Sequence, residues 1–285
     1  MTLQNILSAY FEEEVSIAKE SPISGGSINN TYSINSSKGN FFVKENDSER
    51  YPRMFESEAK GLKLIQSKSC IKTPEIITLD NNSRKSYLIL ELIENGKGSI
   101  QSWGSLGSGL ANLHKNSNDS FGLEHNNYIG SLPQTNIQYG SWGTFYINQR
   151  LEPMVRQAYD NGSFENSILK TFNRFYKELP SIYPIEPPAL LHGDLWSGNF
   201  LFNNNEEAVL IDPAVYYGHR EMDLGMSLLF GGFDEAFYKI YHETYPLEAD
   251  WKNRVPYSQL YPLLVHVNLF GGGYKESVAR IINKF

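Results

Sequence analysis

The fold and function of this chain are constrained most by two apolar runs, each of which is followed by an aspartate. The first is LLHGDLWSGNF, residues 190–200, which carries His192, Asp194 and Asn199 between apolar flanks. The second is VLIDPA, in which Asp212 follows the apolar run thirteen residues after Asn199. One aspartate after a strand is usually a turn residue. Two carboxylates and an amide at this spacing instead predict a catalytic loop followed by a metal ligand.

The spacing of Asp194 and Asn199 is that of the catalytic loop of kinases, H-R-D-L-x-x-x-N. Phosphoryl transfer from ATP needs mainly positioning and charge neutralisation. Asp194 would accept the proton of a substrate hydroxyl or orient that group. Asn199 and Asp212 would bind Mg²⁺, because this ion prefers hard oxygen ligands and completes its shell with water and substrate phosphates.

Two further polar residues near this loop have structural interpretations. His192 as a metal ligand is an alternative that needs more His or carboxylate ligands, and the other five histidines are scattered along the chain. We therefore expect His192 to hold the loop backbone by hydrogen bonds. Asp223 starts an apolar helix, and we expect it either to cap that helix or to anchor the backbone of the catalytic loop.

The first ninety or so residues predict a strand-rich lobe with two helices. Thr2 is placed to cap a short amphipathic helix that begins at Leu3. SPISGGSINNTYSI and NFFVKEN are typical of a hairpin, MFESEAKGLKLIQS has the period of a helix, and EIITL and SYLILELI resemble two more strands.

This lobe contains candidate phosphate-binding residues. Gly25 and Gly26 would let backbone N–H groups approach a phosphate, although a glycine pair in a hairpin is usually only a turn. Alternation places Phe42 and Lys44 on one face of their strand, so Lys44 could bind the α- and β-phosphates. Glu58 borders the apolar stripe of the next helix and could point inward to hold Lys44.

From about residue 94 the pattern becomes mainly helical. We expect helices at about 106–113, 141–159, 164–179, 219–230, 233–244, 257–270 and 274–284, a loop at 120–140, and a short hairpin formed by NFLF and AVLI. The fold class predicted is α+β, with an N-terminal nucleotide-binding lobe at 1–93 and a C-terminal helical catalytic and substrate-binding lobe at 94–285.

Composition excludes several classes of protein. The net charge of −7 and the absence of a dense Lys/Arg run disfavour nucleic acids and anionic membranes as partners. The one cysteine, Cys70, excludes an intrachain disulfide framework. No apolar stretch approaches the length of a membrane span, and the N-terminus lacks the features of a signal peptide, so we expect a cytoplasmic protein.

Beyond the general kinase pattern, the chain resembles the fructosamine kinase (ketosamine-3-kinase) family, within the wider group of aminoglycoside phosphotransferases and choline kinase-like proteins. The motifs that carry this resemblance are GGSINNTY, FFVKEN, MFESEAKGL, IGSLPQTN, GSWGTFYINQRLEPM, HGDLWSGN and IDPAVYYGHREMDLGMSLLFGGF. They are distributed over nearly the whole chain.

The resemblance implies a two-lobed protein-kinase-like fold, with an antiparallel sheet in the N-lobe and a mainly helical C-lobe. It also implies Mg²⁺- and ATP-dependent phosphorylation of the 3-hydroxyl of a ketosamine, either a small molecule or a glycated protein. By resemblance, Asp194 is the catalytic base, Asn199 and Asp212 bind magnesium, and Glu58 holds the phosphate-binding Lys44.

The resemblance also implies residues around the nucleotide and the sugar. The nucleotide-binding residues are Gly25, Gly26, Ser27, Lys44, Glu58, Glu91, Leu92 and Ile93, the last three through backbone contacts to adenine. Trp196 would form a wall of the sugar pocket, or alternatively an apolar plug under the loop. Ser27 stands near the place where some relatives carry a cysteine, so thiol-based control is not expected.

Two other functions stay open at this point. The chain could phosphorylate another small amine-bearing alcohol, such as an aminoglycoside or a choline-like compound, because fold alone does not give substrate. It could also be a nucleotide-binding scaffold without catalysis. The presence of Lys44, Glu58, Asp194, Asn199 and Asp212 argues against a scaffold, because pseudokinases usually lack at least one of these groups.

Overall fold

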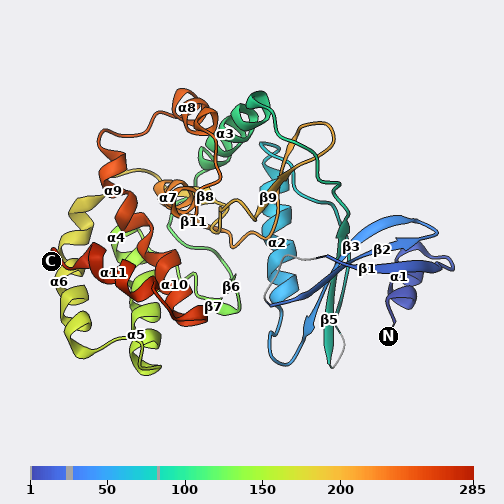
Figure 1. The fold of residues 1–285 in the computed structure, drawn as a ribbon, viewed down its shortest axis with the longest axis horizontal. Coiled ribbons are helices and arrows are strands. Elements are labelled where there is room, and N and C mark those ends of the chain that lie inside the picture. The colour runs from blue at the N-terminus through green and yellow to red at the C-terminus, as the bar shows by residue number, and fades with distance from the viewer. Residues whose placement is uncertain (1, 24–27, 82–83) are drawn as a thin grey trace.

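The computed structural model describes residues 2–23, 28–81 and 84–285, and its N-terminal part is an antiparallel sheet with a helix on each face (Figure 1). The strands are β1 (Ile17–Pro22), β2 (Asn30–Ser36), β3 (Gly39–Asp47), β4 (Ile76–Asn81) and β5 (Lys85–Glu91), in the spatial order β1-β2-β3-β5-β4. The helices are α1 (Leu3–Phe11) and α2 (Met54–Ser67). Thr2 caps α1, as predicted, because its hydroxyl accepts a hydrogen bond from the backbone N–H of Asn5 at 3.3 Å.

Strict alternation along β3 decides which side chains reach the rest of the molecule. Phe41 and Val43 belong to the buried cluster that includes Leu7 of α1. Phe42 packs on the opposite face, in the cluster that α2 contributes to. Lys44 shares that face by the period of two. The predicted alternation is therefore confirmed, and it directs the one lysine of this strand toward α2 and the C-terminal part.

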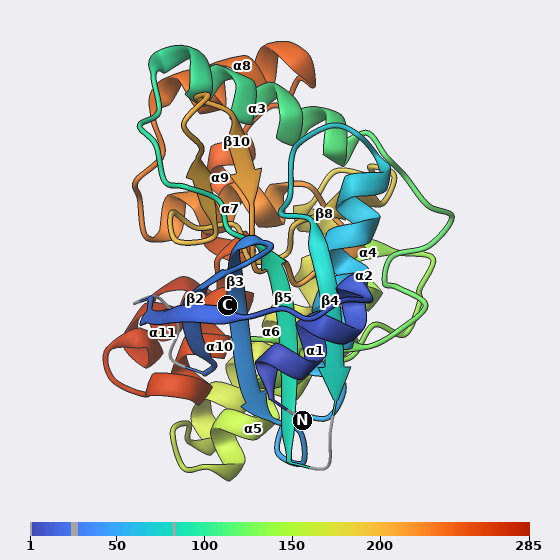
Figure 2. The same ribbon diagram turned by 90° about the vertical axis from the view of Figure 1, so that its right-hand side faces the viewer.

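The C-terminal part is mainly helical with short strands between the helices (Figures 1 and 2). Its helices are α3 (Ile100–His114), α4 (Trp142–Phe145), a π-helix (Tyr146–Leu151), α5 (Glu152–Asp160), α6 (Asn166–Ile182), α7 (Glu221–Leu229), α8 (Glu235–Thr244), α9 (Trp251–Ser258), α10 (Leu260–Phe270) and α11 (Tyr274–Ile282). Its strands pair as three antiparallel ladders: β6 (Asn127–Ile129) with β7 (Leu132–Gln134), β8 (Ala189–Leu191) with β11 (Tyr216–Gly218), and β9 (Phe200–Phe202) with β10 (Ala208–Leu210).

Two expectations about this part were wrong in detail. The segment 120–140 is not only a loop, because it contains the β6–β7 hairpin, whose strands of three residues are too short to show a period of two. The helix expected at 257–270 is two helices, and α9 begins at Trp251. Its sequence, WKNRVPYS, carries polar residues on most faces and a proline, which hides the helical period.

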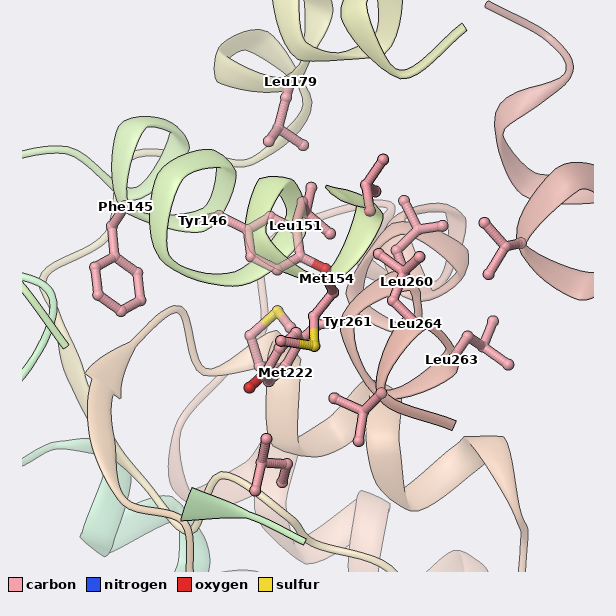
Figure 3. Close-up of a cluster of buried hydrophobic side chains, with 14 of the residues drawn as sticks. Phe145, Tyr146, Leu151, Met154, Leu179, Met222, Leu260, Tyr261, Leu263 and Leu264 are labelled. Carbon is pink, nitrogen blue, oxygen red and sulfur yellow. The ribbon is translucent and has the colours of Figure 1, made fainter. Parts of the chain in front are cut away.

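Apolar side chains of the C-terminal part form two buried clusters, and the larger one lies among its helices. Figure 3 shows Phe145, Tyr146, Leu151 and Met222 among the side chains that α4, the π-helix, α7 and α10 direct toward one another. Phe145, Tyr146 and Leu151 are fully buried. This core fixes the helices that carry the loops described below.

The segment at residues 92–99 joins the two parts without regular secondary structure. The backbone N–H of Gly96 donates to the carbonyl of Phe202 at 2.7 Å, so this segment is held against β9. The division into lobes at residue 93 stays a prediction. Among the described residues, no helix is both long enough and apolar enough to cross a membrane.

Candidate active site

A cleft of about 650 Å³ lies between α2 and β3 on one side and the catalytic-loop segment and α10 on the other. The candidate residues whose side chains would take part in the reaction meet in this cleft. Those that line it are Lys44, Glu58, Asp194, Trp196, Asn199 and Asp212. Residues from four stretches of the chain thus share one space.

Lys44 is held between two carboxylates. Its Nζ lies 2.7 Å from Oε1 of Glu58 and 2.6 Å from Oδ1 of Asp212, and the lysine side chain is only 3% exposed. Burial opposes the charge, but the carboxylates of Asp212 and Glu58 raise the pKa of Lys44 above its usual value. The lysine is therefore a fixed cation, and the inward orientation expected for Glu58 is confirmed.

Asp212 adopts a backbone conformation that is uncommon for a residue with a side chain. Its φ is +53°, in the left-handed region that disfavours all residues except glycine and, less strongly, Asn and Asp. The neighbouring backbone holds it there, because Ile211 N–H donates to the carbonyl of Asn199 at 3.0 Å and Ala214 N–H donates to that of His192 at 2.9 Å. The catalytic loop and the Asp212 segment are therefore one rigid unit.

Asp194 and Asn199 contact each other directly. The amide Nδ2 of Asn199 donates to Oδ2 and to the backbone carbonyl of Asp194, both at 2.9 Å. Burial raises the pKa of Asp194 to about 7, with the hydrogen bond from Asn199 opposing the shift. A carboxyl group whose pKa lies near neutral pH suits a general base.

Asp223 anchors the backbone of the catalytic loop. Its carboxylate accepts hydrogen bonds from the N–H groups of His192 at 2.7 Å and Gly193 at 2.9 Å, and Oδ2 also lies 3.1 Å from Nε2 of His114. Burial opposes its charge, but the hydrogen bond and charge of His114 keep the pKa of Asp223 below its usual value. Of the two roles expected for Asp223, the anchor is confirmed, and Arg220 occupies the N-cap position of α7 instead.

Gly193 and His192 complete this loop. Gly193 has φ of +85°, and a Cβ atom there would lie 2.1 Å from the carbonyl oxygen of Ala214, so only glycine fits. The imidazole of His192 bonds to the carbonyl of Ile211 through Nε2 at 2.9 Å and to the N–H of Asp194 through Nδ1 at 3.3 Å. Burial lowers the pKa of His192, so its ring is neutral and serves the backbone, as expected.

A buried amide network explains the PQTN segment. Asn127 and Gln134 donate to the backbone carbonyls of residues 215 and 214, at 2.8 and 3.1 Å, just after Asp212. Asn136 donates to Asn127 Oδ1 at 3.0 Å and accepts from Arg150 Nη2 at 2.6 Å. These groups fix the strand that follows Asp212.

Trp196 lies at the mouth of the cleft. Its side chain is 38% exposed, and a Cβ atom on Gly198 would lie 2.3 Å from its ring, so the ring covers that glycine. Its exposure disfavours the alternative of an apolar plug under the loop.

The structure does not test the other candidate nucleotide-binding residues. Gly25, Gly26 and Ser27 lie outside the described residues. Glu91 and Ile93 border a separate hollow, and Leu92 stands between them. Residues 91–93 are not among the residues that line the cleft that holds Lys44, although Glu91 and Lys44 belong to the same β3–β5 ladder, and their contact with adenine stays a prediction.

The donor set of the cleft fits magnesium. Asn199 uses its amide nitrogen toward Asp194, which leaves its oxygen as the ligating atom, and Asp212 offers a second hard oxygen. Within the described ranges, no three His, Cys, Asp or Glu residues cluster as a metal cage. Mg²⁺ commonly binds through one or two protein groups and substrate phosphates.

Several residues that line the cleft or support the segments around it were not identified from the sequence. His114, Arg150, His266 and Phe270 were not singled out, and the first two are fully buried polar side chains in helices. The signal that could have indicated Phe270 is a repeat: F-G-G occurs in LLFGGF and again in NLFGGGY.

Comparisons with known proteins place this arrangement in context. The sequence profile described as fructosamine kinase matches residues 1–285. The chain is 38% identical over 266 residues to a probable ketoamine kinase of Enterococcus faecium, covering 93% of this chain and 94% of that protein. It is also 38% identical over 274 residues to the chloroplastic protein-ribulosamine 3-kinase of Arabidopsis thaliana, covering 94% and 83%.

Solved structures agree. A protein from Thermobifida fusca, solved as a candidate fructosamine-3-kinase, superposes with a TM-score of 0.89 at 31% identity, covering 99% of this chain and 97% of that chain. The aminoglycoside phosphotransferase APH(4)-Ia, in complex with AMP-PNP and hygromycin B, gives a TM-score of 0.67 at 14% identity, covering 99% and 98%. At that identity the likeness concerns the fold alone, which is the expected two-part kinase-like α+β fold.

Proposed function

The chain belongs to the fructosamine kinase family, and on this premise we propose that it transfers the γ-phosphoryl group of ATP to the 3-hydroxyl of a ketosamine. One observation carries the proposal most: the pair Asp194–Asn199 and the triad Lys44–Glu58–Asp212 face the same cleft. Both groups are needed for phosphoryl transfer, one at the acceptor and one at the phosphates.

The steps follow from the residues. The carboxylate of Asp194 accepts the proton of the sugar hydroxyl while the hydroxyl oxygen bonds to the γ-phosphorus. The bond from that phosphorus to the bridging oxygen breaks, and ADP leaves with its electron pair. Lys44 binds the phosphates as a fixed cation, and Glu58 maintains its position. A magnesium ion held by Asn199 and Asp212 would supply charge neutralisation at the phosphates.

The remaining assignments complete the proposal. Gly25, Gly26 and Ser27 cover the phosphates, and the backbone of Glu91, Leu92 and Ile93 binds adenine. Trp196 forms a wall beside the sugar, since it follows the base by two residues and faces the cleft. His192 and Asp223 keep the loop in place through the hydrogen bonds described above.

An acceptor panel tests this function. ADP release with magnesium-ATP is measured for a fructosamine, a ribulosamine, an aminoglycoside, choline and no acceptor. We expect turnover with at least one ketosamine, at a rate at least about 100-fold above the no-acceptor rate, and phosphate on the 3-hydroxyl by NMR. Turnover of only the aminoglycoside or choline would overturn the ketosamine assignment while leaving the kinase chemistry. Metal removal by chelation should abolish turnover.

A further inference from the structure

Four aromatic rings form a continuous row at one end of the cleft. The ring of Trp196 lies 6.2 Å from that of Phe230, Phe230 lies 4.9 Å from His266, and His266 lies 5.4 Å from Phe270, centroid to centroid. Trp196, His266 and Phe270 line the cleft. The row therefore runs from the loop that carries Asp194 to the end of α10.

The row is exposed where such side chains are normally buried. Phe230 is 41% and Phe270 is 57% exposed, whereas Phe237 in the same part of the molecule is fully buried. Leu228, also half-exposed, lies two residues before Phe230. Contiguous exposed apolar groups beside a cleft mark a binding surface.

The sequence presents both phenylalanines in the same way. Phe230 directly follows α7 and Phe270 ends α10, and each precedes a glycine pair, residues 231–232 and 271–272. The four φ values are +70°, +88°, +64° and +66°, in the region that glycine adopts readily. The chain turns away at once after each ring, so the ring remains at the rim.

Among the described residues that border a small hollow with Val265 and His266 at this end of the cleft, Asp194 is the one carboxylate. The charged side chains of the lining are Lys44, Glu58, Asp194 and Asp212. The uncharged residues of the lining include Ile129, Gly130, Val265, Leu269 and three of the four rings, those of Trp196, His266 and Phe270. Burial lowers the pKa of His266, and its Nδ1 bonds to the carbonyl of Pro262 at 2.8 Å, so its ring is neutral near pH 7.

We propose that the row Trp196–Phe230–His266–Phe270 binds the amine substituent of the ketosamine, the half of the acceptor that is not phosphorylated. It selects one ammonium carried on an aliphatic or aromatic body, as in the side chain of a glycated lysine, over polycationic amines. The inference rests on the proposed function, and it adds to it the part of the substrate that decides specificity.

The chemistry of the two partners matches. The nitrogen of a ketosamine is a secondary amine that is protonated at neutral pH, and the faces of aromatic rings attract such a cation. The rings also bury the methylene or aryl groups attached to it. An amine with several charges needs a carboxylate for each to replace water, whereas the hollow beside His266 offers only Asp194, which Asn199 already binds.

The test compares acceptors that share one sugar. Fructose adducts of methylamine, benzylamine, the side chain of an Nα-blocked lysine amide, and spermidine are assayed with wild type and with Phe230→Ala, Phe270→Ala and the double variant. Tyr159→Ala on α5 is the matched control, since Tyr159 is 38% exposed and lies outside the lining of the cleft. Thermal unfolding of each variant verifies that it folds.

The wild type should prefer the benzylamine and lysine adducts over the spermidine adduct. The double variant should lower kcat/KM for the first two by about 10- to 100-fold, mainly through KM, and by a smaller factor for the methylamine adduct, which keeps the ammonium but lacks the apolar body. Tyr159→Ala should change none of them. An equal loss for all adducts, no loss, or a wild-type preference for spermidine would overturn the inference while ketosamine turnover stands. If wild type phosphorylates no ketosamine but does phosphorylate another acceptor, the proposed function fails, and the inference fails with it.

Discussion

The two ends of the cleft are held in place by different forces. At one end, Lys44 is buried between Glu58 and Asp212, so each charged group depends on its partners. At the other, Phe230 and Phe270 are half-exposed at the ends of helices, and they are held by packing against other rings and not by ion pairs.

This difference separates the two tasks of a kinase. In our proposal the charged end binds the phosphate chain of ATP, which is the same for every ATP-dependent enzyme. The geometry of this end can therefore be fixed by buried ion pairs. In our proposal the aromatic end binds the acceptor, and because Phe230 and Phe270 are half-exposed, this surface can vary with little disturbance of the core. Fold alone thus indicates the first task, and the site decides the second.

The largest effect on turnover is expected from removing the catalytic base, which lies between the two ends of the cleft. Asp194→Asn keeps the size of the side chain but cannot accept a proton, so kcat should fall by about 10²–10⁴-fold. Affinity for AMP-PNP, measured by calorimetry, should change little, because Asp194 belongs to the acceptor side. Asp160→Asn, at the exposed end of α5, serves as control. Full activity of Asp194→Asn would show that the base is wrongly assigned.

The next largest effect is expected from a substitution that disrupts only the charged end of the cleft. Lys44→Met leaves two carboxylates facing each other, so the free energy of unfolding should fall by about 3 kcal/mol and KM for ATP should rise. Lys85→Met is the matched control: its Nζ lies 2.7 Å from Glu45, but the lysine is 53% exposed, and its loss should cost less than about 1 kcal/mol. Urea unfolding measures both. Equal losses of unfolding free energy in the two variants would mean that burial does not strengthen the ion pairs of Lys44.

The smallest effect reaches both ends through α7, which carries Asp223 and leads to Phe230. His219 lies just before this helix, against Trp142 and Tyr183, and burial lowers its pKa to about 4. In the unfolded chain its pKa is about 6.5, so between pH 6.5 and 4 the unfolded state binds the extra proton. Its contribution to stability is present above pH 6.5 and is lost as the pH falls toward 4.

Comparison with His219→Phe measures this contribution. Urea midpoints at pH 7.5 and 4.5 should show a stability loss about 2 kcal/mol larger for wild type than for the variant, because phenylalanine keeps a ring in place without a titrating group. Identical pH slopes for the two proteins would contradict the assignment of His219.

Particular residues show how far the sequence could be used for prediction. The alternation of NFFVKEN placed Lys44 on the correct face, and the stripe in MFESEAKGL turned Glu58 toward it, because strand and helix periods are local. The β6–β7 hairpin and helix α9 were missed because their signals are shorter or more polar than the period that reveals them. The contact of His114 with Asp223 joins residues 109 positions apart, which no local pattern encodes.

The sequence by itself determined the types and order of the reacting groups: a lysine, a helix glutamate, the H-G-D-x-x-x-x-N loop and a second aspartate. Only the tertiary structure decided that Asp223 bears the loop backbone, that Asp194 is buried enough to titrate near pH 7, and that Phe230, His266 and Phe270 form one exposed row. The reason is physical. Periodicity records which face of an element is apolar, whereas burial, pKa and ring contacts depend on which other elements pack against that face.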